Sequence, residues 1–255
     1  MFSMNVKAPI KSSYLLKEPL EIGGCVISRE KERMTVSTTV KAENEKSGKK
    51  IALDRIRKAI LSWSLATEEF LDFDETNITV VSDSEHSQSV SFTIHTLPGL
   101  TVLKSETEEE ILKTCQLLKN TDDYGIKCSE YYERGIATRS WHSEAALNFY
   151  KVCELIYEKI LAEASEEAIV QRFNKTKEKI TMKEKMVLLC ESIGLTGELK
   201  ENALSLPKIR SMMDVGHARL NETPPTKEIL DDFMRVAKTV VILYLKSTSL
   251  NNPLY

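Results

Sequence analysis

The strongest candidate for chemistry in this chain is the stretch LPKIRSMMDVGHARLNE, residues 206–222, in which an arginine precedes a histidine by seven positions. If the stretch is helical from Pro207, Arg210, Asp214 and His217 fall at i, i+4 and i+7. At about 100° per residue this brings the first and last of them to one face. A guanidinium is always cationic, whereas an imidazole titrates near neutral pH. The pair predicts phosphodiester chemistry, in which Arg210 neutralises charge on the phosphoryl oxygens and His217 moves a proton on or off a ribose hydroxyl. This chemistry needs no metal ligand, and we expect no cofactor.

A plainer interpretation of the same residues stays open. Arg210 can be an ordinary surface arginine and His217 a half-buried helical histidine, because arginine and histidine often occur at such spacings by chance. Glu154, on a predicted helix rich in aromatic residues, also has two interpretations. It is either a surface carboxylate or a partner that reaches the Arg210 guanidinium within a helical bundle.

A basic run follows that aromatic helix and is the one local cationic patch near the candidate site. It is diluted by Glu178 and Glu184, so a solvated surface is one interpretation and a contact with an RNA backbone is the other. The residues that we assign to RNA binding are Arg172, Lys175, Lys177 and Lys179.

Composition limits the remaining classes of function. The 255 residues are 42% hydrophobic and 29% charged, with a formal net charge of −3, so no overall basic field attracts nucleic acid. Five scattered cysteines form no CxxC pair and predict reduced thiols in a cytoplasmic protein. The first residues, MFSMNVKAPIKSS, lack the apolar core of a signal peptide, and no apolar run is long enough to span a membrane.

The pattern along the chain predicts an α+β protein with two domains. Residues 1–103 read as β-β-α-β-β, an antiparallel sheet with a covering helix, in which residues 1–18 form an arm without assigned structure. The predicted elements of this domain are a strand over 20–28, a turn over 29–32, a strand over 34–40, a helix over 51–71, and strands over 77–82 and 89–97.

Residues 104–255 read as a helical bundle. Apolar residues recur at steps of three and four over several segments, and capping residues mark the starts of the helices. The expected helices run from 105 or 107 to 119, over 129–135, from 140 or 143 to 164, over 166–179, from 181 to 193, and from 226 onward. A loop is expected over 195–205.

The C-terminal half resembles the HEPN domains, and within them the Apea-like branch. The resemblance covers about residues 140–247 and rests on an aromatic helix that carries a glutamate (ALNFYKVCELIYEKI), on Arg-Ser with a histidine closely downstream (IRSMMDVGHARL), and on a long apolar last helix. The family motif is an arginine, four to six residues and a histidine, often with a small polar residue after the arginine. Arg210, Ser211 and His217 match it at the long end of the spacing.

What the resemblance implies is a metal-independent endoribonuclease, active as a dimer that brings two motifs together, which cuts RNA through a 2′,3′-cyclic phosphate. A defence or toxin setting would suit such an enzyme. The alternative is a non-catalytic helical module that dimerises or binds a nucleotide. We expect a homodimer because Leu147, Tyr150 and Leu161 extend the apolar stripe of their helix, and the N-terminal domain is left to bind an unknown regulatory partner or ligand.

Overall fold

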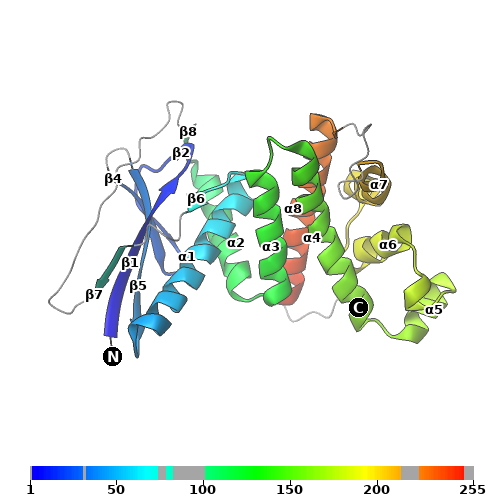
Figure 1. The fold of residues 1–255 in the computed structure, drawn as a ribbon, viewed down its shortest axis with the longest axis horizontal. Coiled ribbons are helices and arrows are strands. Elements are labelled where there is room, and N and C mark those ends of the chain that lie inside the picture. Colours follow the sequence, from blue (N-terminus) through cyan, green and yellow to red (C-terminus); the bar gives the residue numbers. More distant parts are fainter. Residues whose placement is uncertain (1, 31–32, 74–78, 83–100, 214–223, 250–255) are drawn as a thin grey trace. The chain divides into compact units, whose positions relative to one another are not determined.

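The computed structural model describes residues 2–30, 33–73, 79–82, 101–213 and 224–249 (Figure 1). It has the predicted α+β class, with an antiparallel sheet in the N-terminal part and helices in the C-terminal part. The chain divides into two compact units, Met1–Lys119 and Asn120–Tyr255. The division falls later than the boundary predicted after residue 103, because Ile111 and Cys115 of the next helix are buried in the core of the first unit.

The N-terminal unit is built on a six-stranded sheet with the order β3-β4-β5-β1-β6, and β7 also pairs with β1. All of these pairings are antiparallel, and β2 and β8 form a separate short parallel pair. The strands are β1 (Phe2–Lys11), β2 (Tyr14–Leu15), β3 (Leu20–Ile22), β4 (Cys25–Glu30), β5 (Arg33–Ala42), β6 (Asp72–Phe73), β7 (Thr79–Ser82) and β8 (Thr101–Val102).

Two strand predictions in this unit were wrong. The supposed arm contains β1, which lies inside the sheet and buries Met4, Val6 and Ala8 on one face, the alternation of a half-buried strand. The single strand predicted over 20–28 is a hairpin, since β3 and β4 are joined by a turn at Gly23 and Gly24. The strand predicted over 89–97 lies outside the described residues.

Two helices pack on this sheet and complete its core. α1 (Glu45–Thr67) contacts β5, β1 and β4, and α2 (Ser105–Lys119) packs against α1 and β3. α1 starts earlier than the predicted residue 51, because the Asn44 side chain accepts a hydrogen bond from the Ser47 backbone N–H at 2.9 Å and caps the helix there. Trp63 of α1 is fully buried, as expected for a core residue.

The C-terminal unit is a helical bundle, as predicted. Its central pair is α3 and α4, against which α8 packs, while α6 and α7 lie against α4. The helices are α3 (Asp123–Ala137), α4 (His142–Glu163), α5 (Glu166–Phe173), the short 3₁₀ helix η2 (Lys177–Lys179), α6 (Met182–Ser192), α7 (Gly197–Met213) and α8 (Lys227–Ser249).

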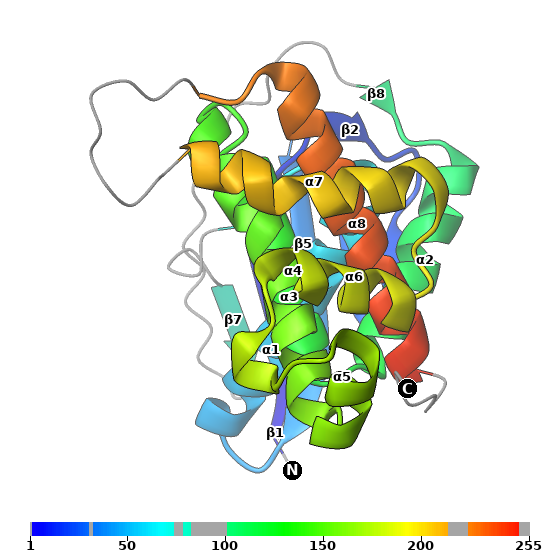
Figure 2. The same cartoon turned by 90° about the vertical axis from the view of Figure 1, so that its right-hand side faces the viewer.

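Helix ends in this bundle follow local chemistry. Thr181 and Glu184 form a reciprocal capping box at the start of α6, and Gly194 follows its end with a φ of +72°. α5 stops at Phe173, short of the predicted residue 179, because Asn174 takes a left-handed conformation with a φ of +53°. Figure 2 shows α7 lying across α4 and α8, with α6 beside it.

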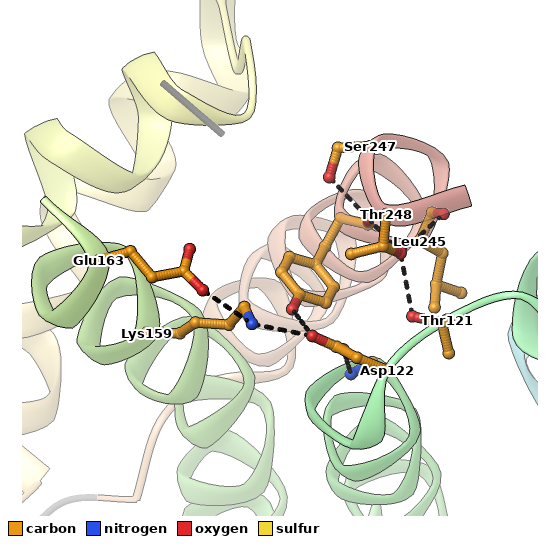
Figure 3. Close-up of polar contacts among 9 residues, drawn as sticks. Thr121, Asp122, Lys159, Glu163, Leu245, Ser247 and Thr248 are labelled. Carbon is orange, nitrogen blue, oxygen red and sulfur yellow. Dashed lines mark hydrogen bonds and ion pairs between the residues drawn. The ribbon is translucent and has the colours of Figure 1, made fainter. Parts of the chain in front are cut away.

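A polar network holds three helices of the bundle together (Figure 3). The Asp122 carboxylate caps α3 by accepting from the Gly125 N–H at 2.9 Å, and it also accepts from the Tyr244 hydroxyl of α8 at 2.8 Å. Lys159 of α4 lies 2.9 Å from the same carboxylate and 3.0 Å from Glu163. One carboxylate therefore joins α3, α4 and α8.

Within the described ranges, no helix is both long enough and apolar enough to cross a bilayer.

Candidate functional site

Arg210 lies in the last turn of α7, which is longer than the sequence indicated. The segment expected to be a loop up to residue 205 is helical from Gly197, and Pro207 lies inside the helix instead of opening it. The loop prediction was wrong because Ala203 and Leu206 are buried, so packing holds a helix that the proline alone would disfavour. A continuous helix therefore presents Arg210 to α4.

The Arg210 guanidinium stacks over an aromatic ring of α4. Its Cζ lies 5.2 Å from the centroid of the Tyr150 ring, within the range of a cation–π contact, and the arginine is only partly buried. A guanidinium donates hydrogen bonds through N–H groups in its own plane, so a contact with the ring does not by itself use up these donors.

Tyr150 and Tyr157 lie two turns apart on α4, and both are fully buried. Burial raises the pKa of each hydroxyl, so both stay protonated at neutral pH. The Tyr157 hydroxyl donates to Met182 Sδ at 3.1 Å, whereas the Tyr150 hydroxyl has no partner of hydrogen-bonding geometry among the described residues. Tyr157 and the positive charge of Arg210 nonetheless act on Tyr150, because each lowers its pKa.

Glu154 is paired with a neighbour on its own helix. Its carboxylate lies 2.5 Å from the Lys151 ammonium group, and the Glu154 side chain is only 21% exposed. The structure shows no ion pair between Glu154 and Arg210, so the predicted contact is not formed in this conformation. Beside the larger effect of burial, the Glu154 charge acts to raise the pKa of Tyr150 and the Arg210 charge acts to lower it.

Of the remaining predicted catalytic residues, Ser211 belongs to α7, and the other two follow this helix in the sequence. Ser211 is exposed, and its hydroxyl donates to the Lys208 backbone carbonyl at 2.7 Å. Asp214 and His217 lie outside the described residues, so the alignment of Arg210 with His217 on one helical face stays a prediction.

No protein-family model, curated protein or solved structure matches this chain. The resemblance to the HEPN domains therefore stays a prediction that rests on the quoted residues.

Two of the four cations assigned to RNA binding are paired with carboxylates. Arg172 pairs with Glu191, and Lys175 lies 2.7 Å from Glu184. The hydrogen bond from Lys175 and those from the capping residue of α6 lower the pKa of Glu184 to about 2, so the acid is charged at neutral pH. These two cations are less available to RNA than the sequence indicated.

Lys177 and Lys179 differ from the two paired cations. The Lys177 ammonium group contacts the Ala162 carbonyl at 3.4 Å, and Lys179 is exposed. Neither has a carboxylate at ion-pairing distance in the part of the chain that the structure describes. The structure thus narrows the candidate RNA contacts from four side chains to these two.

Sequence reasoning missed one exposed aromatic residue of the bundle. Trp141 directly precedes α4 and is 71% exposed, although a large indole usually loses most of its surface on folding. The next residue, His142, places its Nδ1 atom 2.8 Å from the Pro225 carbonyl, which follows the segment containing His217 in the chain. The only sequence signal was a tryptophan among polar residues in RSWHS, which does not distinguish exposure from burial.

All five cysteines are buried and unpaired. Among the residues that the structure describes, no group of three or more His, Cys, Asp or Glu side chains is arranged to hold a metal ion.

Proposed function

We propose that this chain is a metal-independent endoribonuclease of the HEPN type, acting in the cytoplasm, in which Arg210 and His217 carry the reaction. The observation that supports the proposal best is the position of Arg210. A partly exposed guanidinium at the end of α7 lies on the aromatic face of α4, the helix that also carries Glu154. The aromatic helix and the Arg-Ser pair are two of the features on which the resemblance rests.

In the proposed reaction the ribose 2′-hydroxyl attacks the adjacent phosphorus atom. His217 takes the proton from this hydroxyl or returns one to the departing 5′-oxygen, and the products are a 2′,3′-cyclic phosphate and a free 5′-hydroxyl. Arg210 neutralises the charge that grows on the non-bridging oxygens of the phosphorane. The contact with the Tyr150 ring supports this role, because it holds the guanidinium against α4 before the substrate binds.

A second candidate is a non-catalytic helical module that dimerises or binds a nucleotide. The observation that favours it is the same stacking of Arg210 on Tyr150, since a cation–π contact of about 1 kcal/mol also gives the arginine a structural use. Under this interpretation the side chain fastens α7 to α4 and takes no part in chemistry.

RNA cleavage by the purified full-length protein in excess chelator separates the two candidates. We expect cleavage to persist in chelator and the new 3′ ends to be 2′,3′-cyclic phosphates. Absence of cleavage with and without divalent cations would support the non-catalytic module. Cleavage that requires a divalent cation would contradict the proposed mechanism.

We also propose that the active form is a homodimer, as the resemblance implies. The sequence predicted an apolar dimer surface that includes Leu147, Tyr150 and Leu161. This prediction was wrong, because Tyr150 and Leu161 are buried inside the bundle and Leu147 is partly covered. The proposed homodimer therefore depends only on the resemblance, which implies a dimer that brings two Arg–His motifs together.

Light scattering at micromolar concentration is expected to give a mass near twice 28.9 kDa. A mass of one chain at concentrations where RNA is cleaved would contradict the paired-site arrangement.

Replacing Lys177 and Lys179 together with alanine is expected to weaken RNA binding and to reduce its salt dependence, because lysine contacts phosphates as a point charge. The single-turnover rate at saturating RNA should stay unchanged. Arg172→Ala is the matched control, since Glu191 already engages that cation, and it should change binding less. An unchanged salt slope in the double variant would contradict a role for these lysines in RNA binding.

A further inference from the structure

The N-terminal unit contains a cavity of about 370 Å³ that the proposed ribonuclease reaction does not use. It lies between the turn joining β3 to β4, the middle of α1 and the end of α2. Its lining includes Gly23, Gly24, Asp54, Arg55, Lys58 and Lys119.

Three cations and one carboxylate line this cavity, so its charge is positive. Asp54 lies 3.1 Å from Lys58 and offsets that one cation. Arg55 donates through Nη1 to the Thr39 carbonyl at 3.1 Å, which leaves most of its N–H groups unused. Among the described residues, neither Arg55 nor Lys119 has a carboxylate at ion-pairing distance.

Two glycines of a tight turn line the cavity and shape it. Gly23 and Gly24 have φ values of +64° and +86°, as in the tightest type of β-hairpin turn. A Cβ atom on Gly23 would lie 2.7 Å from Cys115 Sγ and 3.3 Å from Lys119 Cε, so a side chain there would close the cavity.

The thiols beside the cavity do not make it a nucleophilic site. Cys25 and Cys115 are both buried, and burial raises the pKa of Cys25 to about 11, so its thiol is protonated at neutral pH. The charges of Arg55 and Lys119 act to lower that pKa. Arg55 Nη1 would lie 3.8 Å from a Cβ atom on Gly24, so both cations approach the glycine turn. The site offers positive charge and hydrogen-bond donors, and it lacks a reactive group.

We propose that this cavity binds a phosphate group, either as inorganic phosphate or pyrophosphate or as the phosphates of a small nucleotide. Planar guanidinium and ammonium donors together match the tetrahedral oxygens of a phosphate. Among the residues that the structure describes, no aromatic side chain lines the cavity, so the phosphate and not a nucleobase is the recognised part. The inference goes beyond the proposed function and does not depend on it.

Calorimetric titration of the full-length protein with inorganic phosphate, pyrophosphate and ATP, at constant ionic strength, tests the proposal. We expect saturable binding of at least one probe and weaker binding at high salt. Binding of phosphate or pyrophosphate at least as tight as that of ATP identifies the free anion as the ligand, whereas tighter binding of ATP identifies a nucleotide.

Lys119→Ala is expected to weaken that binding at least about fivefold, because it removes one charge-assisted contact. Arg55→Gln should do the same while keeping a donor for the Thr39 carbonyl. Lys113→Ala, on the same helix as Lys119 and paired with Glu109 away from the cavity, is the matched control and should bind as the wild type does. Absence of saturable binding by all three probes at millimolar concentration would overturn the proposal. Binding that Lys119→Ala and Arg55→Gln leave unchanged, with circular dichroism confirming that both variants are folded, would overturn it too.

Discussion

Replacing His217 with alanine is expected to reduce RNA cleavage by about 10² to 10⁴, the usual contribution of a general acid or base. The measurement is the single-turnover rate at saturating RNA, so that a change in affinity does not enter. The melting temperature should hardly change, because a catalytic side chain has to stay accessible to RNA and therefore contributes little to the packing of the fold. A destabilised His217→Ala variant that still cleaves RNA would show that His217 is a structural residue and would contradict the assignment.

Arg210→Lys tests the other residue of the proposed pair, because it keeps the positive charge and removes the planar guanidinium group. We expect the same rate to fall at least about tenfold, since an ammonium group cannot bind two phosphoryl oxygens side by side. Tyr150→Phe is the structural control. It keeps the ring that Arg210 contacts and removes a hydroxyl that has no hydrogen-bond partner among the described residues, so both activity and stability should be retained. If Arg210→Lys lowers the melting temperature and leaves the rate unchanged, the arginine serves only to fasten α7.

The helices of the bundle were predictable because their signals are local. α2, α4, α6 and α8 each combine an apolar stripe with a recognisable first turn, and each begins within two residues of an expected start. α7 was missed in its first half because Pro207 masked the helical pattern before it. Its stability comes from packing against neighbours, which a local pattern does not contain.

The sheet was harder to predict because strand pairing is not local. β1 has buried Met4, Val6 and Ala8 at alternate positions. Because the segment also contains Pro9 and lysines, the sequence did not indicate a strand there. Pro9 is tolerated near the end of this strand, although proline cannot donate to the ladder. The pair Gly23-Gly24 carried the signal of a two-residue hairpin, and that signal was available in the sequence.

The candidate site was predictable only in its residue types. The sequence indicated that Arg210 and Glu154 belong to neighbouring helices, yet which side chain faces which depends on the rotation of α7 over α4. In the structure Arg210 contacts the Tyr150 ring and Glu154 pairs with Lys151. The cavity of the N-terminal unit was not predictable, because its lining residues come from three separate segments of the chain.

Replacing Asp122 with alanine is expected to lower the free energy of unfolding by about 2 to 4 kcal/mol. The carboxylate caps α3, and loss of a helix cap costs about 1 kcal/mol. The change also leaves the Tyr244 hydroxyl of α8 without its acceptor, at a further cost of about 1 to 3 kcal/mol. Asp123→Ala is the matched control, because this neighbouring aspartate is exposed, and urea denaturation at neutral pH should show a change within about 0.5 kcal/mol.

The same network predicts how this difference varies with pH. Burial acts to raise the pKa of Asp122, but hydrogen bonds from Lys159, Gly125 and Tyr244 outweigh burial and lower it. A carboxyl group whose pKa is lower in the folded protein stabilises the fold above its unfolded pKa of about 3.9, and this stabilisation is lost as the pH falls through the folded pKa. The stability gap between the wild type and Asp122→Ala should therefore be largest at neutral pH and shrink below about pH 4. A gap that stays constant across this range would mean that the Asp122 charge does not contribute, and that the loss in the variant comes from packing alone.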